Sequence, residues 1–144
     1  MLVDSHSHLF LEEFSDDLPQ VMQRAHDAGV THIFMPNIDS TTIGPLLSVC
    51  NTYKGFCFPM IGLHPTSVNE SYEKELDIVA HQLAPFNEYV AIGEIGLDLY
   101  WDKTFLKEQL IVFEKQIEWA LEYHLPIVVH CREAFEYIYK VLVL

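Results

Sequence analysis

The sequence lacks the features that mark several common classes of protein. It has no run of about 18 consecutive apolar residues, the length that a membrane-spanning helix requires. Its N-terminus has no basic region followed by an apolar stretch and a small-residue cleavage site, so no secretory signal is predicted. Its three cysteines, Cys50, Cys57 and Cys131, are odd in number and far apart, which argues against a disulfide scaffold. We therefore expect a protein of the reducing cytoplasm that has no membrane partner.

Basic residues are also scarce. The 144 residues include 8 Lys and Arg against 21 Asp and Glu, which gives a formal net charge of −13. A protein that grips nucleic acid through its phosphates usually presents a basic face. If this protein acts on a nucleic acid, bound cations must supply much of the local positive charge. The simpler interpretation of the acidity is solubility, and both interpretations stay open.

Apolar residues make up 50% of the chain, enough for a globular domain with a sizeable core. Apolar runs predict strands at 2–5, 31–36, 56–62, 89–95 and 126–130, and helical spacing predicts helices at 16–28, 40–52, 69–83, 105–123 and 133–144. In the helix at 105–123 the apolar stripe consists of Leu106, Leu110, Phe113, Ile117 and Leu121. The strands are too apolar to leave one face in water, which indicates a parallel sheet covered by helices. No linker divides the sequence, so we predict an α/β fold and a single domain over residues 1–144.

Four of the five predicted strands bring His or Glu to their C-terminal ends. The residues concerned, together with polar residues just beyond them, are His6, His8, His64, Glu94, Asp98, His130 and Arg132. Barrel and open α/β enzymes build their active sites at that end of the strands. The sequence therefore predicts a site there. Cys131 follows His130, but adjacent strand residues point to opposite faces, so a Cys–His nucleophile is not expected.

The first strand leads into a His-x-His pair. Side chains at i and i+2 of a strand share a face, so His6 and His8 are expected to project together and bind one metal ion. Asp4 has the same parity and is a candidate acceptor for an imidazole N–H. Histidine nitrogens with carboxylate oxygens suit Zn²⁺, Mn²⁺ or Fe²⁺, and Mg²⁺ less well.

Each candidate also has a structural interpretation. A His-x-His pair by itself is a weak signal, and His64 before Pro65 could simply shape a turn. Glu94 could belong to a buried salt bridge, and His130 could be a core histidine with its hydrogen bonds satisfied. Asp98 could be a helix N-cap or a loop residue. The residues alone leave these alternatives open.

The segments DSHSHLF, GLHP, AIGEIGLD and VVHCREA, in this order and spacing, resemble the TatD family of metal-dependent deoxyribonucleases. That family belongs to the amidohydrolase-like superfamily of (β/α)₈ barrels. The resemblance runs from residue 2 to the end of the chain and implies the N-terminal five (βα) units of a TIM barrel, incomplete at this length. It implies hydrolysis of phosphodiester bonds in DNA by divalent metal ions, two per complete site, which would be Mg, Mn or Zn. It implies metal binding by His6, His8, Glu94 and His130, and catalytic or substrate-side roles for Glu94, His64, Asp98 and Arg132.

Two further ligands are expected in the family, a histidine after the sixth strand and an aspartate near the eighth. Neither segment is among the five predicted units. We therefore expect the 144-residue chain to be an open form with impaired activity, whose free sheet edges favour self-association. Two other functions stay open. A small-molecule amidohydrolase or lactonase shares the histidine pattern but often has a modified lysine where this chain has Glu94. The third possibility is a fragment that binds metal without catalysis.

Overall fold

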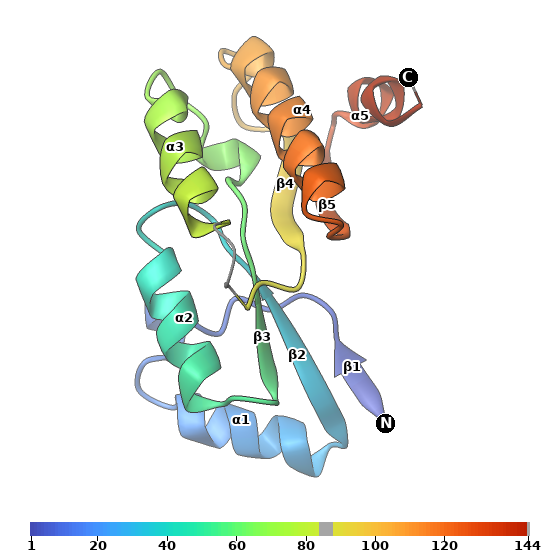
Figure 1. Cartoon of the computed structure of the whole chain (residues 1–144). Helices are drawn as coiled ribbons and strands as arrows, with labels where there is room; N and C mark the ends of the chain where they lie inside the picture. The colour runs from blue at the N-terminus through green and yellow to red at the C-terminus, as the bar shows by residue number, and fades with distance from the viewer. Residues whose placement is uncertain (84–87, 144) are drawn as a thin grey trace.

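The computed structural model describes residues 1–83 and 88–143, in which five strands alternate with five α-helices (Figure 1). The strands are β1 (Leu2–Asp4), β2 (Val30–Pro36), β3 (Cys57–Met60), β4 (Ile92–Asp98) and β5 (Ile127–Arg132). The helices are α1 (Leu18–Asp27), α2 (Ile43–Thr52), α3 (Tyr72–Gln82), α4 (Leu106–Glu122) and α5 (Phe135–Leu142). Two short 3-10 helices complete the chain, η1 (Glu12–Phe14) and η2 (Pro65–Ser67). The predicted order of five (βα) units is confirmed.

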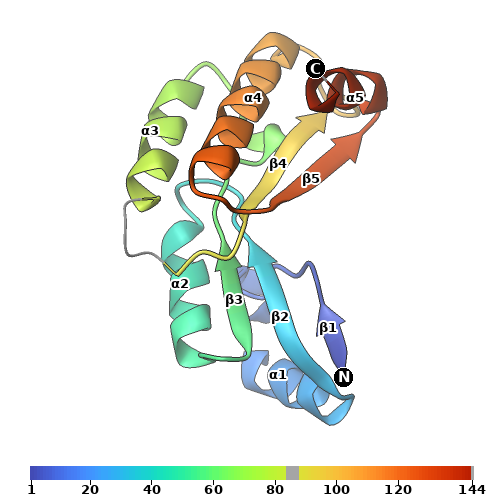
Figure 2. The same ribbon diagram turned by 45° about the vertical axis from the view of Figure 1, so that its right-hand side comes forward.

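The strands run parallel and follow the order of the chain. β1 pairs with β2, β2 with β3, and β4 with β5. The two parts are joined by a parallel bridge between Ile61 and Ile92. Ile61 also receives a hydrogen bond at its carbonyl oxygen from the Gly93 amide, at 2.8 Å. The sheet is therefore open, with β1 and β5 at its edges (Figure 2).

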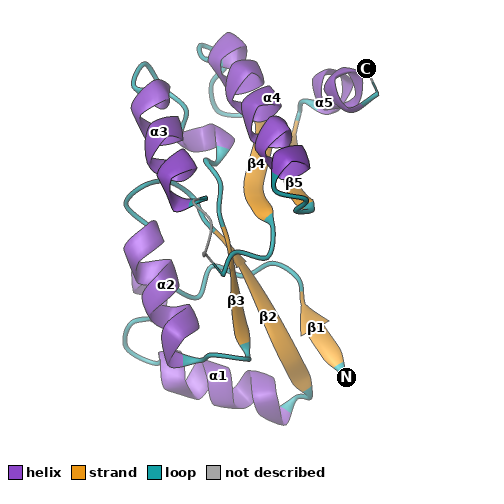
Figure 3. Ribbon diagram, viewed as in Figure 1, coloured by secondary structure: helices purple, strands orange, loops and turns teal. Residues whose placement is uncertain are grey.

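The helices α2, α3 and α4 lie on the same side of the strands, as the purple helices and orange strands of Figure 3 show. Two hydrophobic clusters fill the space between the layers. One packs α1 and α2 against β2, and the other packs α3 and α4 against β4. Every residue of β4 is buried, whereas β1 and β5 are partly or fully exposed along their length. The expectation of strands buried on both faces is correct for β4 and wrong for the two edge strands, because each of those has a neighbour on one side only.

The ends of the strands differ from the predicted ones where the site lies. β4 begins three residues later than predicted and continues to Asp98, which pairs with Arg132 at the end of β5. Gly96 makes this pairing possible. It has a φ of +134°, and a Cβ at that position would collide with the carbonyl oxygen of His130. Asp98 is therefore a strand residue and not a helix N-cap or a loop residue. Among the described residues, no helix has the length and apolarity to cross a membrane.

Candidate metal centre

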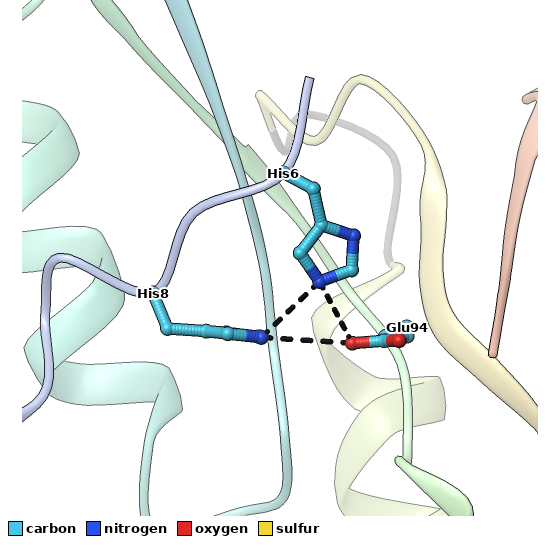
Figure 4. Close-up of side chains that lie close together, drawn as sticks. All are labelled: His6, His8 and Glu94. Atoms are coloured by element: carbon cyan, nitrogen blue, oxygen red, sulfur yellow. Dashed lines mark hydrogen bonds and ion pairs between the residues drawn. The ribbon is translucent and has the colours of Figure 1, made fainter. Parts of the chain in front are cut away.

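His6 and His8 lie in the segment that follows β1, not on the strand itself. The amide of Ser7 donates a hydrogen bond to the carbonyl oxygen of Phe34, at 3.1 Å, which holds this segment against β2. The two imidazoles do project together, since their Nε2 atoms are 3.2 Å apart. Figure 4 shows both rings turned toward Glu94.

Glu94 occupies the middle of the histidine cluster. It is the third residue of β4 and is 6% exposed. Its Oε2 lies 3.0 Å from Nε2 of His6 and 3.6 Å from Nε2 of His8, while its Oε1 lies 3.2 Å from Nδ1 of His130. The two carboxylate oxygens thus face different imidazoles. Within the described part of the chain, the ion-pair partners of Glu94 are all histidines, so a buried salt bridge to Lys or Arg is not what holds it.

The hydrogen bonds of His8 leave its Nε2 free to bind a cation. Its Nδ1 lies 3.0 Å from the carbonyl oxygen of Pro36. A carbonyl oxygen only accepts, so Nδ1 carries the proton and Nε2 presents its lone pair to Glu94 and His6. Histidines that bind metal ions usually donate their other ring N–H in this way.

His130 has the same arrangement with its two nitrogens exchanged. Its Nε2 lies 2.8 Å from Oδ2 of Asp98, a buried carboxylate that can only accept. In the neutral ring the lone pair is therefore on Nδ1, and in the protonated ring that atom donates a hydrogen bond to Oε1 of Glu94, 3.2 Å away. Asp98 fixes the orientation of this ring, as a carboxylate commonly does for a metal-binding histidine.

His64 differs from the other rings because its Nδ1 is an acceptor. The amide of Thr66 donates to that atom at 3.2 Å, and the Thr66 hydroxyl lies 2.6 Å from it. The proton of the neutral ring is therefore on Nε2, which points at Nδ1 of His130 from 3.2 Å. In this arrangement His64 is a hydrogen-bond donor that faces the cluster, and not a ligand.

The charges of the cluster favour a cation. Burial by itself raises the pKa of Glu94, but the four surrounding imidazoles outweigh burial and hold that pKa well below its usual range. Burial lowers the pKa of His64 from 6.5 to about 4, against the opposing charge of Glu94. The hydrogen bond with Glu94 raises the pKa of His130, although burial of the ring acts in the opposite direction. At pH 7 the centre therefore contains an ionised carboxylate beside a neutral His64.

These donors fit a divalent metal ion. The ligand atoms of His6, His8 and Glu94 lie within 4.8 Å of one another, and so do those of His64, Glu94 and His130. Imidazole nitrogens with one carboxylate are a donor set typical of Zn²⁺ and Mn²⁺. The first group can direct lone pairs from all three residues to one point. In the second group His64 directs an N–H at the site and offers no lone pair to a cation. Only Glu94 and His130 are left to bind an ion there.

The family model described as TatD related DNase matches residues 3–143. The chain belongs to this family. The matched span includes all of the histidines and carboxylates just described, and the resemblance noted in the sequence is confirmed.

The TatD relatives are longer than this chain. The uncharacterized metal-dependent hydrolase YabD of Bacillus subtilis is 37% identical over 142 residues, which cover 99% of this chain and 55% of YabD. The 3'-5' ssDNA/RNA exonuclease TatD of Erwinia billingiae is 32% identical over 130 residues, 90% of this chain and 49% of that protein. The crystal structure of YjjV, a TatD homolog from Escherichia coli K12, matches with a TM-score of 0.88 at 29% identity, over 98% of this chain and 54% of that one. The chain thus spans about half the length of the curated relatives it matches.

Two of the residues singled out in the sequence lie outside the cluster of this TatD-family chain. Oδ1 of Asp4 accepts a hydrogen bond from the backbone amide of His6, at 3.1 Å. The expectation that Asp4 binds an imidazole N–H is therefore wrong, because β1 ends at Asp4 and the chain turns there. Arg132 is exposed, and its guanidinium carbon lies 3.9 Å from the centre of the Tyr100 ring. Its role as a phosphate ligand stays a prediction.

Three buried amide side chains hold the backbone of the site, and sequence reasoning missed them. Gln116, on α4, accepts a hydrogen bond from the amide of Leu63 and donates one to its carbonyl oxygen. Gln109, two turns earlier on the same helix, makes the same pair of bonds with the backbone of Asp98. Asn37 donates to the carbonyl oxygen of Gly62. Exposed polar residues of α4 such as Lys107 and Glu114 have the same spacing as Gln109 and Gln116, so the sequence has no clear signal for this role.

Proposed function

We propose that this chain carries part of the active site of a metal-dependent nuclease that hydrolyses phosphodiester bonds in DNA or RNA. The observation that carries the proposal is the position of Glu94, whose two oxygens face His6 and His8 on one side and His130 on the other. A buried carboxylate among imidazoles is a poor way to stabilise a fold, since apolar residues of similar volume do so at least as well. The named exonuclease activity of the Erwinia billingiae relative supports the choice of substrate.

In this proposal each residue has a separate task. His6, His8 and Glu94 hold one divalent ion, and Glu94 with His130 contributes to a second, the ions being Mg, Mn or Zn. Bound ions of this kind neutralise phosphate charge and lower the pKa of coordinated water, in zinc sites to about 7. Asp98 keeps the His130 ring in the tautomer that directs Nδ1 at the centre.

His64 and Arg132 act on the substrate in the same proposal. His64 stays neutral at pH 7 because burial lowers its pKa to about 4, so its Nε2–H donates a hydrogen bond without adding charge. A phosphoryl oxygen beside the cluster is the acceptor that suits this donor. Arg132 supplies a guanidinium that can bind a phosphate with two parallel hydrogen bonds.

A second candidate function is hydrolysis of a small amide or lactone. The formal charge of −13 favours it, because a polyanionic substrate is repelled by an acidic protein. The same metal ligands serve both reactions. The two candidates therefore differ in the substrate that is cleaved and not in the metal that is bound.

The test compares the wild-type chain with Glu94→Gln and, as a matched control, Glu73→Gln on the exposed surface of α3. Isothermal titration with Mn²⁺ and Zn²⁺ measures metal binding, and a 3'-labelled single-stranded oligonucleotide and a small lactone measure hydrolysis. We expect Glu94→Gln to lose metal affinity and any metal-dependent cleavage, and Glu73→Gln to behave like the wild type. Equal metal affinity in all three proteins would overturn the proposal. Cleavage of the lactone without cleavage of the oligonucleotide would favour the second candidate.

Three expectations from the sequence remain part of the proposal. The three cysteines are free, which supports a reducing compartment such as the cytoplasm. The edge strands β1 and β5 leave backbone groups that support self-association of the 144-residue chain. The single-domain assignment is supported by the hydrogen bonds between residues 59–61 and residues 90–93, which join the two parts of the sheet.

A further inference from the structure

An exposed group of three side chains lies beside the metal centre, and two of them, Tyr100 and Trp101, have no part in the function proposed above. Tyr100 and Trp101 follow β4, and their rings meet edge to face with centres 4.7 Å apart. The guanidinium carbon of Arg132 lies 3.9 Å from the centre of the Tyr100 ring and 5.3 Å from that of Trp101. Trp101 is 73% exposed and Tyr100 is 49% exposed, and neither belongs to the two hydrophobic clusters. Packing therefore does not account for these rings.

The hydrogen bonds of Asp98 connect this group to the metal centre. Its Oδ1 accepts from the amide of Tyr100, at 3.1 Å, and its Oδ2 is paired with Nε2 of His130. The amide of Leu99 donates to the carbonyl oxygen of Arg132, at 2.9 Å. The backbone at Tyr100 is thus held by the same carboxylate that orients His130.

A pocket of about 420 Å³ lies between the Trp101 ring and two residues, Asp98 and Thr66, that hydrogen-bond the cluster histidines His130 and His64. Trp101, Asp102 and Phe105 line one part of it, and Asp98 and Thr66 line the part next to the centre. Thr66 is the residue that fixes the tautomer of His64. The volume lies within the range of about 300–1,000 Å³ that is typical of small-ligand sites.

We propose that Trp101, Tyr100 and this pocket form a nucleobase-binding subsite, in which a base of the substrate strand stacks on the exposed indole. The proposal rests on the proposed nuclease function and names the part of the substrate that the protein recognises. An acidic chain gains little from phosphate contacts, whereas stacking on an aromatic face needs no positive charge and accepts any base. Among the described residues, no carboxylate lies within ion-pair distance of Arg132. Its guanidinium, which lies over the Tyr100 ring, can therefore contact one phosphate of the same strand.

The test measures binding of fluorescently labelled ten-nucleotide single strands, one of DNA and one of RNA, by anisotropy in EDTA. Without metal ions the strands are not cleaved, so the outcome is independent of whether the chain is a nuclease. We expect Trp101→Ala to weaken binding about tenfold and Trp101→Phe to keep most of the affinity. A strand of abasic units has no base that can stack on the indole, so it should bind the wild type and the Trp101→Ala protein equally weakly. The matched control is Tyr123→Ala, which removes an exposed ring at the opposite end of α4.

The dependence on salt gives a second readout. With one phosphate contact, the plot of log affinity against log salt should have a slope of about −0.7, and Arg132→Gln should bring it close to zero. If the Trp101→Ala protein binds only one of the two strands, DNA or RNA, more weakly than the wild type does, the subsite is specific for that nucleic acid. The proposal is overturned if the wild type binds no strand in EDTA, if Trp101→Ala binds as the wild type does, or if the abasic strand binds as tightly as the normal one. Failure of the nuclease function would appear instead as absence of metal-dependent cleavage while stacking persists.

Discussion

The substitution Gln116→Leu should reduce both the stability of the fold and the fixed position of His64. The Gln116 side chain is fully buried, and its amide makes bonds of 2.7 Å and 3.2 Å with the backbone of Leu63, which is also fully buried. Leucine has a similar size but cannot pair with either backbone group. Each buried group left unpaired costs about 1–3 kcal/mol, and the greater apolarity of leucine offsets about 1–2 kcal/mol of the total. The middle of these values gives a net loss of about 2–3 kcal/mol in the free energy of unfolding, a large fraction of a typical 5–15 kcal/mol.

Urea denaturation of the metal-free chain measures this loss as a lower midpoint at an unchanged m-value. The position of His64 is followed by NMR titration of its ring proton. In the wild type, burial lowers the pKa of His64 to about 4, and release of the Leu63 backbone should let that pKa rise toward 6.5. The matched control is Gln20→Leu, on the exposed surface of α1. A Gln116→Leu protein within about 0.5 kcal/mol of the control, with the same His64 titration as the wild type, would refute the reasoning.

Four further outcomes are expected. Glu94→Gln should bind Mn²⁺ at least tenfold more weakly in isothermal titration, since it loses the carboxylate charge that faces the imidazoles; unchanged affinity would contradict the assigned ligand. Gly96→Ala should fail to give a cooperative unfolding transition by circular dichroism, because its Cβ meets a backbone carbonyl of β5; a wild-type transition would show that β4 and β5 can separate there. In the metal-free chain, the contribution of His64 to stability should fall by at most about 3 kcal/mol as the pH drops from about 6.5 to about 4, because the unfolded His64 takes up a proton that the buried ring does not. The difference in pH dependence between the wild type and His64→Asn measures this contribution. A thiol reagent should modify exposed Cys131 at once and the other two cysteines only on unfolding, so that rapid reaction of all three would argue against the packing around α2.

The layout of the fold could be predicted because it follows from local patterns. The helix that ends before Gly29 was predicted from its apolar spacing, and Gly29 takes the positive φ of +88° that ends such helices. The parallel sheet followed from apolar strands separated by helices. The strand ends were less accurate because pairing with a neighbour, and not the apolar run alone, decides where a strand stops. Thus β4 continues to Asp98 through its register with Arg132.

The chemistry of the site was only partly predictable. The residue types were readable, but the tautomers depend on distant partners, the carbonyl of Pro36 for His8 and the amide of Thr66 for His64. The apolar stripe predicted for α4 includes Leu121, which is 72% exposed. The helix instead buries Gln116, because the backbone of Leu63 requires a partner. A polar residue with two backbone partners cannot be told from a surface residue by hydropathy alone.

The parallel order of the strands also determines when the centre can assemble during protein synthesis. His6 lies on the segment after β1, yet its cluster includes His130 on β5, which follows only after the four crossovers through α1, α2, α3 and α4. At about 5–20 residues per second, the ribosome needs roughly 6–25 seconds to extend the chain from one residue to the other. For roughly the first 4–18 seconds of that time, until residue 94 is added, His6 and His8 lack the carboxylate that completes their site. The centre therefore assembles late in translation. In a nascent chain that pauses before β4, only the two imidazoles of His6 and His8 are available to bind a metal ion, because Glu94 has not yet been added.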